Sequence, residues 1–144
     1  MSSAVSENKR MQRILTIYAG RKQHAAKLLA TATEAFDAAQ TRHQLMADLI
    51  DEYLADAQAR RETHAGVLRG TMMFYQQLAS AHQHHELEMQ RLADQLKQRR
   101  QSYRESAARQ QALENLIAKR AADHEKQARK KAERGQVSRR PSKL

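Results

Sequence analysis

Apolar residues recur along this chain at alternating steps of three and four, in two long stretches separated by a segment containing Gly66 and Gly70. A repeat of 3.5 residues keeps one stripe of a helix against a partner helix when the two supercoil. The first stripe consists of Leu15, Tyr18, Lys22, Ala25, Leu29, Ala32, Phe36, Ala39, His43, Met46, Ile50, Tyr53, Ala57, Arg60, His64 and Val67. The second consists of Tyr75, Leu78, His82, His85, Met89, Leu92, Leu96, Arg99, Tyr103, Ser106, Gln110, Leu113, Ile117 and Arg120. The pattern predicts an all-α fold, two long antiparallel helices forming a coiled-coil hairpin.

A compact three- or four-helix bundle is the alternative fold for such a pattern. Composition argues against it, because two Phe, four Tyr and no Trp offer little material for a thick core. Helix breakers are also scarce, with four glycines and a single proline, Pro141. The chain therefore permits helices of about fifty residues.

The two glycines between the stripes can adopt the positive φ that ends a helix and reverses the chain. Ser6 is a suitable N-cap for the first helix. The expected elements are a hairpin over residues 1–134, made of a helix at about 7–64, a turn at about 65–70 and a helix at about 71–133, followed by a disordered basic tail at 135–144. With that turn, facing residues have numbers that sum to about 136. Tyr53 is then expected near His82.

The net charge of +10 is concentrated at the C-terminus. Residues 118–144 carry ten Lys or Arg against three acids. Such a segment can attract nucleic acid, anionic lipid or an acidic protein surface, and charge alone does not choose between them.

The chain contains no cysteine, which excludes disulfides, thiolate catalysis and cysteine-based zinc sites. The first ten residues lack the apolar core of a signal peptide, and no run approaches eighteen apolar residues. We therefore expect neither a leader nor a membrane span.

His82, His84 and His85, beside Glu86 and Glu88, form the densest group of potential metal ligands. On a helix His84 points away from the other two, and in the expected register the remaining histidines lie too far along the hairpin to join them. No phosphate-binding glycine loop or nucleophile elbow is present either. We therefore expect no metal, no cofactor, no small-molecule substrate and no catalytic residue.

Apolar residues are in surplus near the turn, where Leu49 adjoins the first stripe and Met72, Met73 and Phe74 adjoin the second. Two interpretations are open. These side chains form a partner surface, or they pack over the turn as a local cap.

Three segments resemble the FliJ/YscO family. They are Leu49-Ile50-Asp51-Glu52-Tyr53, Tyr75-Gln76-Gln77-Leu78, and the stretch from Arg109 to Arg120 that runs into a basic tail. The resemblance covers roughly residues 10–134. It implies a non-enzymatic stalk of a flagellar or virulence-type III export apparatus, cytoplasmic and peripherally associated with the inner membrane. The implied partners are the export ATPase hexamer, the export-gate membrane protein and escort chaperones.

The resemblance also implies two contact regions. The export-gate patch falls on Met46, Leu49, Tyr53, Tyr75 and Leu78. The ATPase-facing end falls on Leu113, Ile117, Lys119 and Arg120. Two other functions fit the pattern: a coiled coil whose basic tail binds nucleic acid phosphates, and a dimeric scaffold whose helices pair between chains with a hinge at 66–70. Nucleic acid is the less favoured partner, because no aromatic residue follows Tyr103 to stack on bases.

Overall fold

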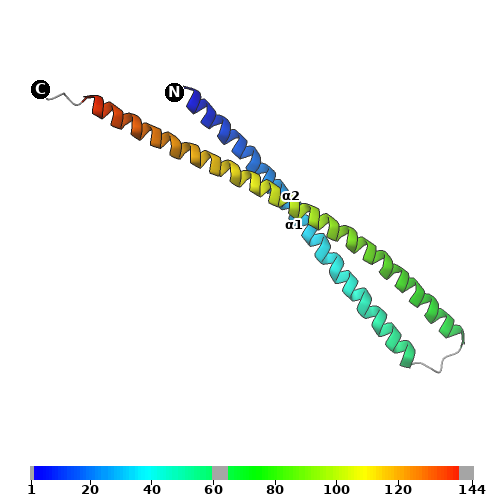
Figure 1. The fold of residues 1–144 in the computed structure, drawn as a ribbon. Coiled ribbons are helices and arrows are strands. Elements are labelled where there is room, and N and C mark those ends of the chain that lie inside the picture. The colour runs from blue at the N-terminus through cyan, green and yellow to red at the C-terminus, as the bar shows by residue number, and fades with distance from the viewer. Residues whose placement is uncertain (1, 60–64, 140–144) are drawn as a thin grey trace. The chain divides into compact units, whose positions relative to one another are not determined.

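A computed structural model of the chain describes two α-helices (Figure 1). Helix α1 spans Ser2–Ala59 and helix α2 spans Ala65–Arg139; residues 1, 60–64 and 140–144 are not described. Every described residue is helical, and α1 packs against α2. The predicted all-α helical hairpin is therefore confirmed, and the compact three- or four-helix bundle is not what the chain forms.

The chain divides into two compact units. The loop unit, residues 25–103, contains the C-terminal part of α1 and the N-terminal part of α2. The terminal unit, residues 1–24 and 104–144, contains the start of α1 and the end of α2. In each unit the two helical segments pair with one another.

The core of the loop unit is thin and follows the predicted stripes. Among the described residues only Ala25, Ala32, Ala39 and Leu96 are buried apolar side chains. The three alanines recur at seven-residue spacing, so they lie on one face of α1. Because a methyl group is small, they allow the backbone of α2 to approach closely. The neighbouring stripe positions, from Leu29 to Ala57, are half-buried.

The terminal unit has a looser interior. Leu15 and Tyr18 of α1 and Ser106, Leu113 and Ile117 of α2 are half-buried, as their stripe positions predict. Ile17 and Leu116, which lie off the stripes, are exposed. Most described stripe positions in both units are thus buried or half-buried, but Tyr75 and Arg120 are exposed, and neither unit buries a large side chain completely among the described residues.

The turn predicted at 65–70 is wrong. Residues 65–70 form the first turns of α2, and no described glycine has a positive φ. A glycine inside a helix destabilises it by about 1 kcal/mol relative to alanine, which is too little to end the helix. The hinge at 66–70 that the dimeric scaffold requires is therefore absent. The stripe positions Arg60 and His64 lie outside the described residues.

The earlier start of α2 changes the register between the helices. The rings of Tyr53 and Phe74 lie 4.8 Å apart, so Tyr53 meets α2 eight residues before the predicted His82. His85 instead reaches α1 at Ala39, where its Nε2 lies 2.9 Å from the backbone oxygen. A shift of about one heptad leaves apolar stripes facing each other, which explains why the stripes alone did not fix it.

Both outer helix ends extend further than predicted. Helix α1 begins at Ser2, so Ser6 lies inside the helix and is not its N-cap. Nothing in residues 2–6 breaks a helix, since glycine and proline are absent there. Helix α2 continues to Arg139, so residues 135–139 of the predicted disordered tail are helical, and the rest of that tail, 140–144, lies outside the described residues.

Candidate functional site

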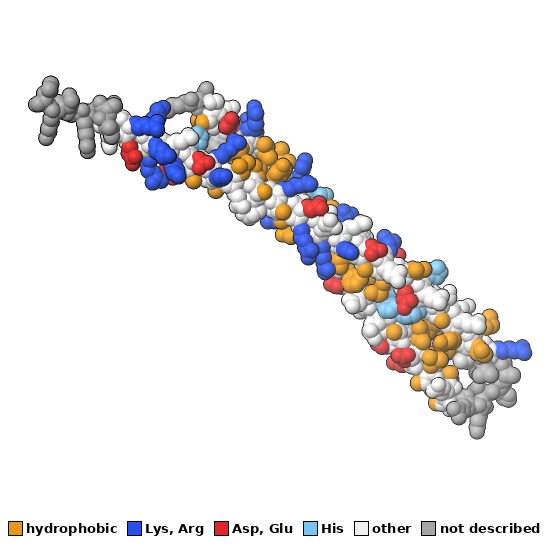
Figure 2. All heavy atoms as spheres, in the orientation of Figure 1, with side chains coloured by type: hydrophobic (Ala, Val, Ile, Leu, Met, Phe, Trp, Pro, Cys, Tyr) orange, Lys and Arg blue, Asp and Glu red, His pale blue; other side chains and the backbone are white. Residues whose placement is uncertain are grey.

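An exposed apolar patch lies where the loop unit approaches its connection. It comprises Leu45, Leu49, Leu54, Met72, Met73, Phe74 and Tyr75, hereafter the closed-end patch. Figure 2 shows hydrophobic side chains gathered in this part of the hairpin, beside histidines. Tyr53 and Phe74 join the two helices of the patch through their ring contact. These seven large apolar side chains near the connection are exposed to solvent, which makes this part of the loop unit a candidate contact surface.

The five residues predicted for the export-gate patch divide into two groups. Leu49 is 49% exposed and Tyr75 is 37% exposed, so both can meet a partner. Met46, Tyr53 and Leu78 are half-buried and support the patch from the seam. The structure therefore brings the five residues to one end of the loop unit, in two different roles.

Met72, Met73 and Phe74 stay at least 45% exposed. That exposure favours the partner-surface interpretation over the local cap. Sequence reasoning missed Leu45 and Leu54, the patch members on α1 that lie off the stripe. Leu45 and Leu49 lie one helical turn apart on one flank of the predicted stripe, whereas Leu54 lies on its other flank, so no single spacing pattern marks them.

At the other end, Leu113 and Ile117 are half-buried seam residues, while Lys119 and Arg120 are exposed. Although Arg120 is exposed, its side chain also reaches α1. One of its guanidinium nitrogens lies 3.7 Å from a carboxylate oxygen of Glu7 and 3.9 Å from the sulfur of Met11. Arg120 therefore links α2 to α1 within the terminal unit.

A groove of about 360 Å³ accompanies this link. Val5, Glu7 and Met11 of α1 line it together with Arg120 and His124 of α2. Its lining is more apolar than polar and includes one acidic residue, Glu7, and one basic residue, Arg120.

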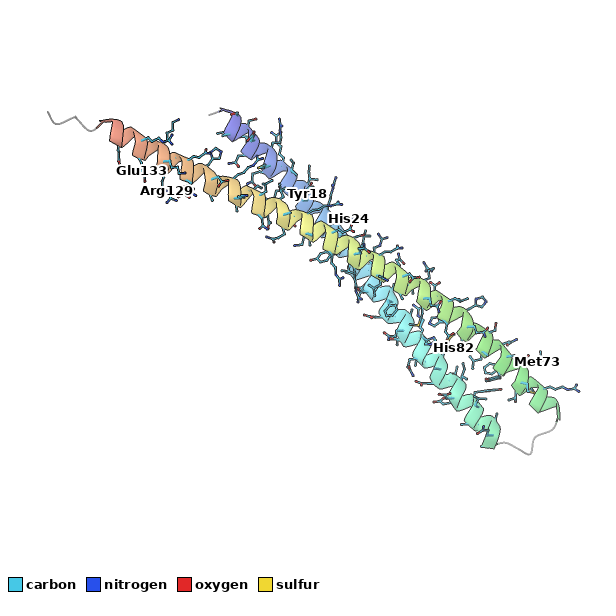
Figure 3. The ribbon with its side chains drawn as sticks, in the orientation of Figure 1. Tyr18, His24, Met73, His82, Arg129 and Glu133 are labelled. Carbon is cyan, nitrogen blue, oxygen red and sulfur yellow. The ribbon has the colours of Figure 1, made fainter. Side chains whose placement is uncertain are left out.

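Every residue of α2 from 121 to 134 is exposed. Residues 126–134 of this segment, hereafter the basic overhang, carry Lys126, Arg129, Lys130, Lys131 and Arg134 against the single acid Glu133. Arg129 pairs with Glu125 at 3.6 Å in the same helix (Figure 3). An exposed pair of this kind contributes little to folding, so the charges of the overhang are available to a partner.

Three histidines meet in the middle of the loop unit, contrary to prediction. The rings of His43 and His82 stack with centroids 4.4 Å apart, and the rings of His43 and His85 lie 5.8 Å apart. His43 comes from α1, whereas the other two come from α2; Figure 3 labels His82. The prediction failed because the predicted register placed His43 opposite a position near residue 93, about eleven residues from His82. A correct turn position would have found the group.

The histidine cluster leaves polar atoms unsatisfied. The Nδ1 atoms of His43 and His82 are buried and have no hydrogen-bond partner among the described residues. An unpaired buried nitrogen costs about 1–3 kcal/mol, so such a pair calls for a compensating ligand or a structural reason. His85 differs, because the Ala39 backbone oxygen engages its Nε2.

Glu86 and Glu88 lie on the same stretch of α2, and their carboxylates have different partners. A carboxylate oxygen of Glu86 lies 3.6 Å from Nε2 of His82. Glu88 instead accepts a hydrogen bond from Nε of Arg91 at 3.1 Å, and this interaction lowers the pKa of Glu88 below its ordinary value. Glu86 is therefore the carboxylate associated with the histidines.

None of the described helical segments is long and apolar enough to cross a membrane. No protein-family model matches the chain, and comparisons with characterised proteins and with solved structures return no match.

Proposed function

We propose that this chain is a non-enzymatic coupling stalk of a bacterial type III export ATPase complex, flagellar or virulence-type. In this proposal the terminal unit engages the export ATPase hexamer. The closed-end patch binds the export-gate membrane protein and escort chaperones. The protein works in the cytoplasm, peripherally associated with the inner membrane export apparatus.

The observation that carries the proposal is the presence of two exposed surfaces of different chemistry on one helical hairpin. The loop unit exposes the apolar closed-end patch, whereas the terminal unit exposes the basic overhang. A protein that couples two partners needs two such surfaces, and two paired helices supply them without an additional domain. The resemblance of its segments to the FliJ/YscO family supplies the identity of the partners.

The chemistry of each surface suits its proposed partner. Large, flexible or aromatic side chains such as Met73 and Phe74 are the residues that anchor protein interfaces. The basic overhang suits an acidic or polar channel lining, and its contribution should appear mainly in the association rate and in its dependence on salt.

The proposal is tested by ATP turnover of the purified export ATPase with and without the chain. The parent chain should stimulate hydrolysis. The double charge reversal Lys130→Glu with Lys131→Glu should reduce that stimulation, most at low salt where screening is weakest. Both residues are exposed, so the helical content should not change.

A matched control reverses Lys97 and Arg100, two exposed residues of α2 in the loop unit. The control changes the net charge equally and should leave stimulation intact. Absence of stimulation by the parent chain would refute the proposal. If the parent instead binds DNA and the Lys130/Lys131 variant loses that binding, the nucleic-acid function replaces it.

The gate-facing surface makes a separate prediction. Leu49→Ala should weaken binding to the export-gate cytoplasmic domain by roughly tenfold, because an exposed apolar anchor is lost, while the melting temperature stays nearly unchanged. Biolayer interferometry and thermal melts give the two quantities. Leu87→Ala is the control, since Leu87 is 63% exposed but lies outside the closed-end patch. Equal affinities for the two variants would remove Leu49 from the interface.

A further inference from the structure

A set of metal-ligating groups lies in the loop unit, on stretches of α1 and α2 that pack against one another. One ring nitrogen each from His43 and His82 and a carboxylate oxygen of Glu86 all lie within 4.8 Å of one another. His82 and Glu86 are four residues apart on α2, so they share one face, and His43 approaches from α1. The cluster joins the two helices of the hairpin.

We propose that His43, His82 and Glu86 bind a divalent transition-metal cation that accepts imidazole nitrogen, with Zn²⁺ as its representative. Two imidazoles and one carboxylate form a common protein ligand set for Zn²⁺, with the fourth position left to water. At metal–ligand distances of 2.0–2.1 Å, tetrahedral ligand atoms lie about 3.3 Å apart. The three groups therefore need to close by about 1.5 Å at most, which side-chain rotation can supply.

The unsatisfied nitrogens support a ligand at this place. The Nδ1 atoms of His43 and His82 are buried without a hydrogen-bond partner among the described residues. In a metal site, the nitrogen that does not bind the metal normally donates a hydrogen bond. Coordination through Nδ1 would satisfy such a ring nitrogen directly.

The residues around the three proposed ligands help to position them. His85 stacks beside His43 and is anchored by the Ala39 backbone oxygen, so it buttresses the His43 ring without being free to rotate. Glu88 is held by Arg91, which leaves Glu86 as the available carboxylate. The bound cation would cross-link α1 and α2 and fix the register of the loop unit.

The experiment titrates the full chain with Zn²⁺ by isothermal calorimetry and follows its thermal unfolding. The parent should bind one Zn²⁺ per chain and melt at a higher temperature with Zn²⁺ than without, because the cation binds the folded hairpin preferentially. Mg²⁺ should have no effect, since it prefers oxygen ligands. Co²⁺ should give the visible absorption of a tetrahedral complex.

Variants then identify the ligands. His43→Ala and His82→Ala should each lower Zn²⁺ affinity on the order of 100-fold. Loss of a residue that only hydrogen-bonds to a metal ligand already lowers affinity by up to about that factor, and loss of a ligand itself should cost at least as much. Glu86→Gln should lower it with the fold intact, because Glu86 is exposed and the substitution preserves its shape. His84→Ala is the matched control, since His84 is exposed on the same stretch of α2, and it should bind like the parent.

Three outcomes would overturn the inference. They are no Zn²⁺ binding by the parent, unchanged affinity in Glu86→Gln, and an equal loss in His84→Ala and His82→Ala, which would indicate scattered surface histidines. Circular dichroism of each metal-free variant establishes that it is folded before its affinity is compared. These measurements use no ATPase, so their result is independent of the coupling function.

Discussion

Leu96→Ala should lower the free energy of unfolding by about 3 kcal/mol, the largest loss expected from truncating one side chain of this protein. Leu96 is 6% exposed, and it is the only large residue among the buried apolar side chains described, the others being alanines. Its removal leaves a gap that the other buried apolar side chains described, Ala25, Ala32 and Ala39, cannot refill, because an alanine side chain ends at Cβ and has no rotatable atoms.

Urea denaturation followed by circular dichroism measures this loss. Leu87→Ala is the control, because it makes the same chemical change on the same helix at an exposed position. The control should alter stability by no more than about 0.5 kcal/mol. Similar losses in the two variants would mean that Leu96 does not lie in the seam.

Ala32→Asp should also destabilise the hairpin, by about 3 kcal/mol more than the same substitution at Ala30. Ala32 is 7% exposed and belongs to the alanine stripe of α1, whereas Ala30 is exposed two residues earlier. The Ala30 variant reports the poor helix propensity of aspartate, so the difference between the two isolates the cost of an unpaired charge in the seam.

The short side chain is important, because a lysine or arginine could extend to water from the same position. The difference should shrink at acidic pH, where the introduced carboxyl group can be buried as its neutral form. Equal stabilities of the Ala30 and Ala32 variants at neutral pH would contradict the close approach of α2 to the alanine stripe.

The sequence was sufficient to predict the fold because periodicity is a local property. Each position such as Leu29 or Ala39 is assigned to the seam by its own neighbours, three and four residues away, and the burial of these positions agrees. The all-α hairpin follows from that assignment together with the scarcity of helix breakers.

Register is not a local property, and it was predicted wrongly. The stripes repeat every seven residues, so sliding α2 along α1 by a heptad keeps apolar residues in contact. Only the position of the turn distinguishes the alternatives, and Gly66 and Gly70 suggested one that the helix in fact passes through. The histidine cluster depends on register, which is why His43 and His82 were kept apart.

The candidate contact surfaces were predicted in part. Leu49 and Tyr75 are exposed near the connection, whereas nothing in the sequence separates Leu54 from ordinary surface residues that flank the stripe. Arg120 lies in the terminal unit, and its link to Glu7 depends on the register of that unit.

The pairing of α1 with α2 inside one chain, in the register that joins Tyr53 to Phe74, underlies both the closed-end patch and the metal site. Because the chain contains no cysteine, it can be measured by cross-linking introduced cysteines with a short bismaleimide at low protein concentration. The pair Tyr53→Cys with Phe74→Cys should link within monomers. Tyr53→Cys with His82→Cys should link poorly, because residue 82 lies about 12 Å further along α2. Preferential linking of the second pair, or covalent dimers as the main product, would contradict the structure proposed for this hairpin.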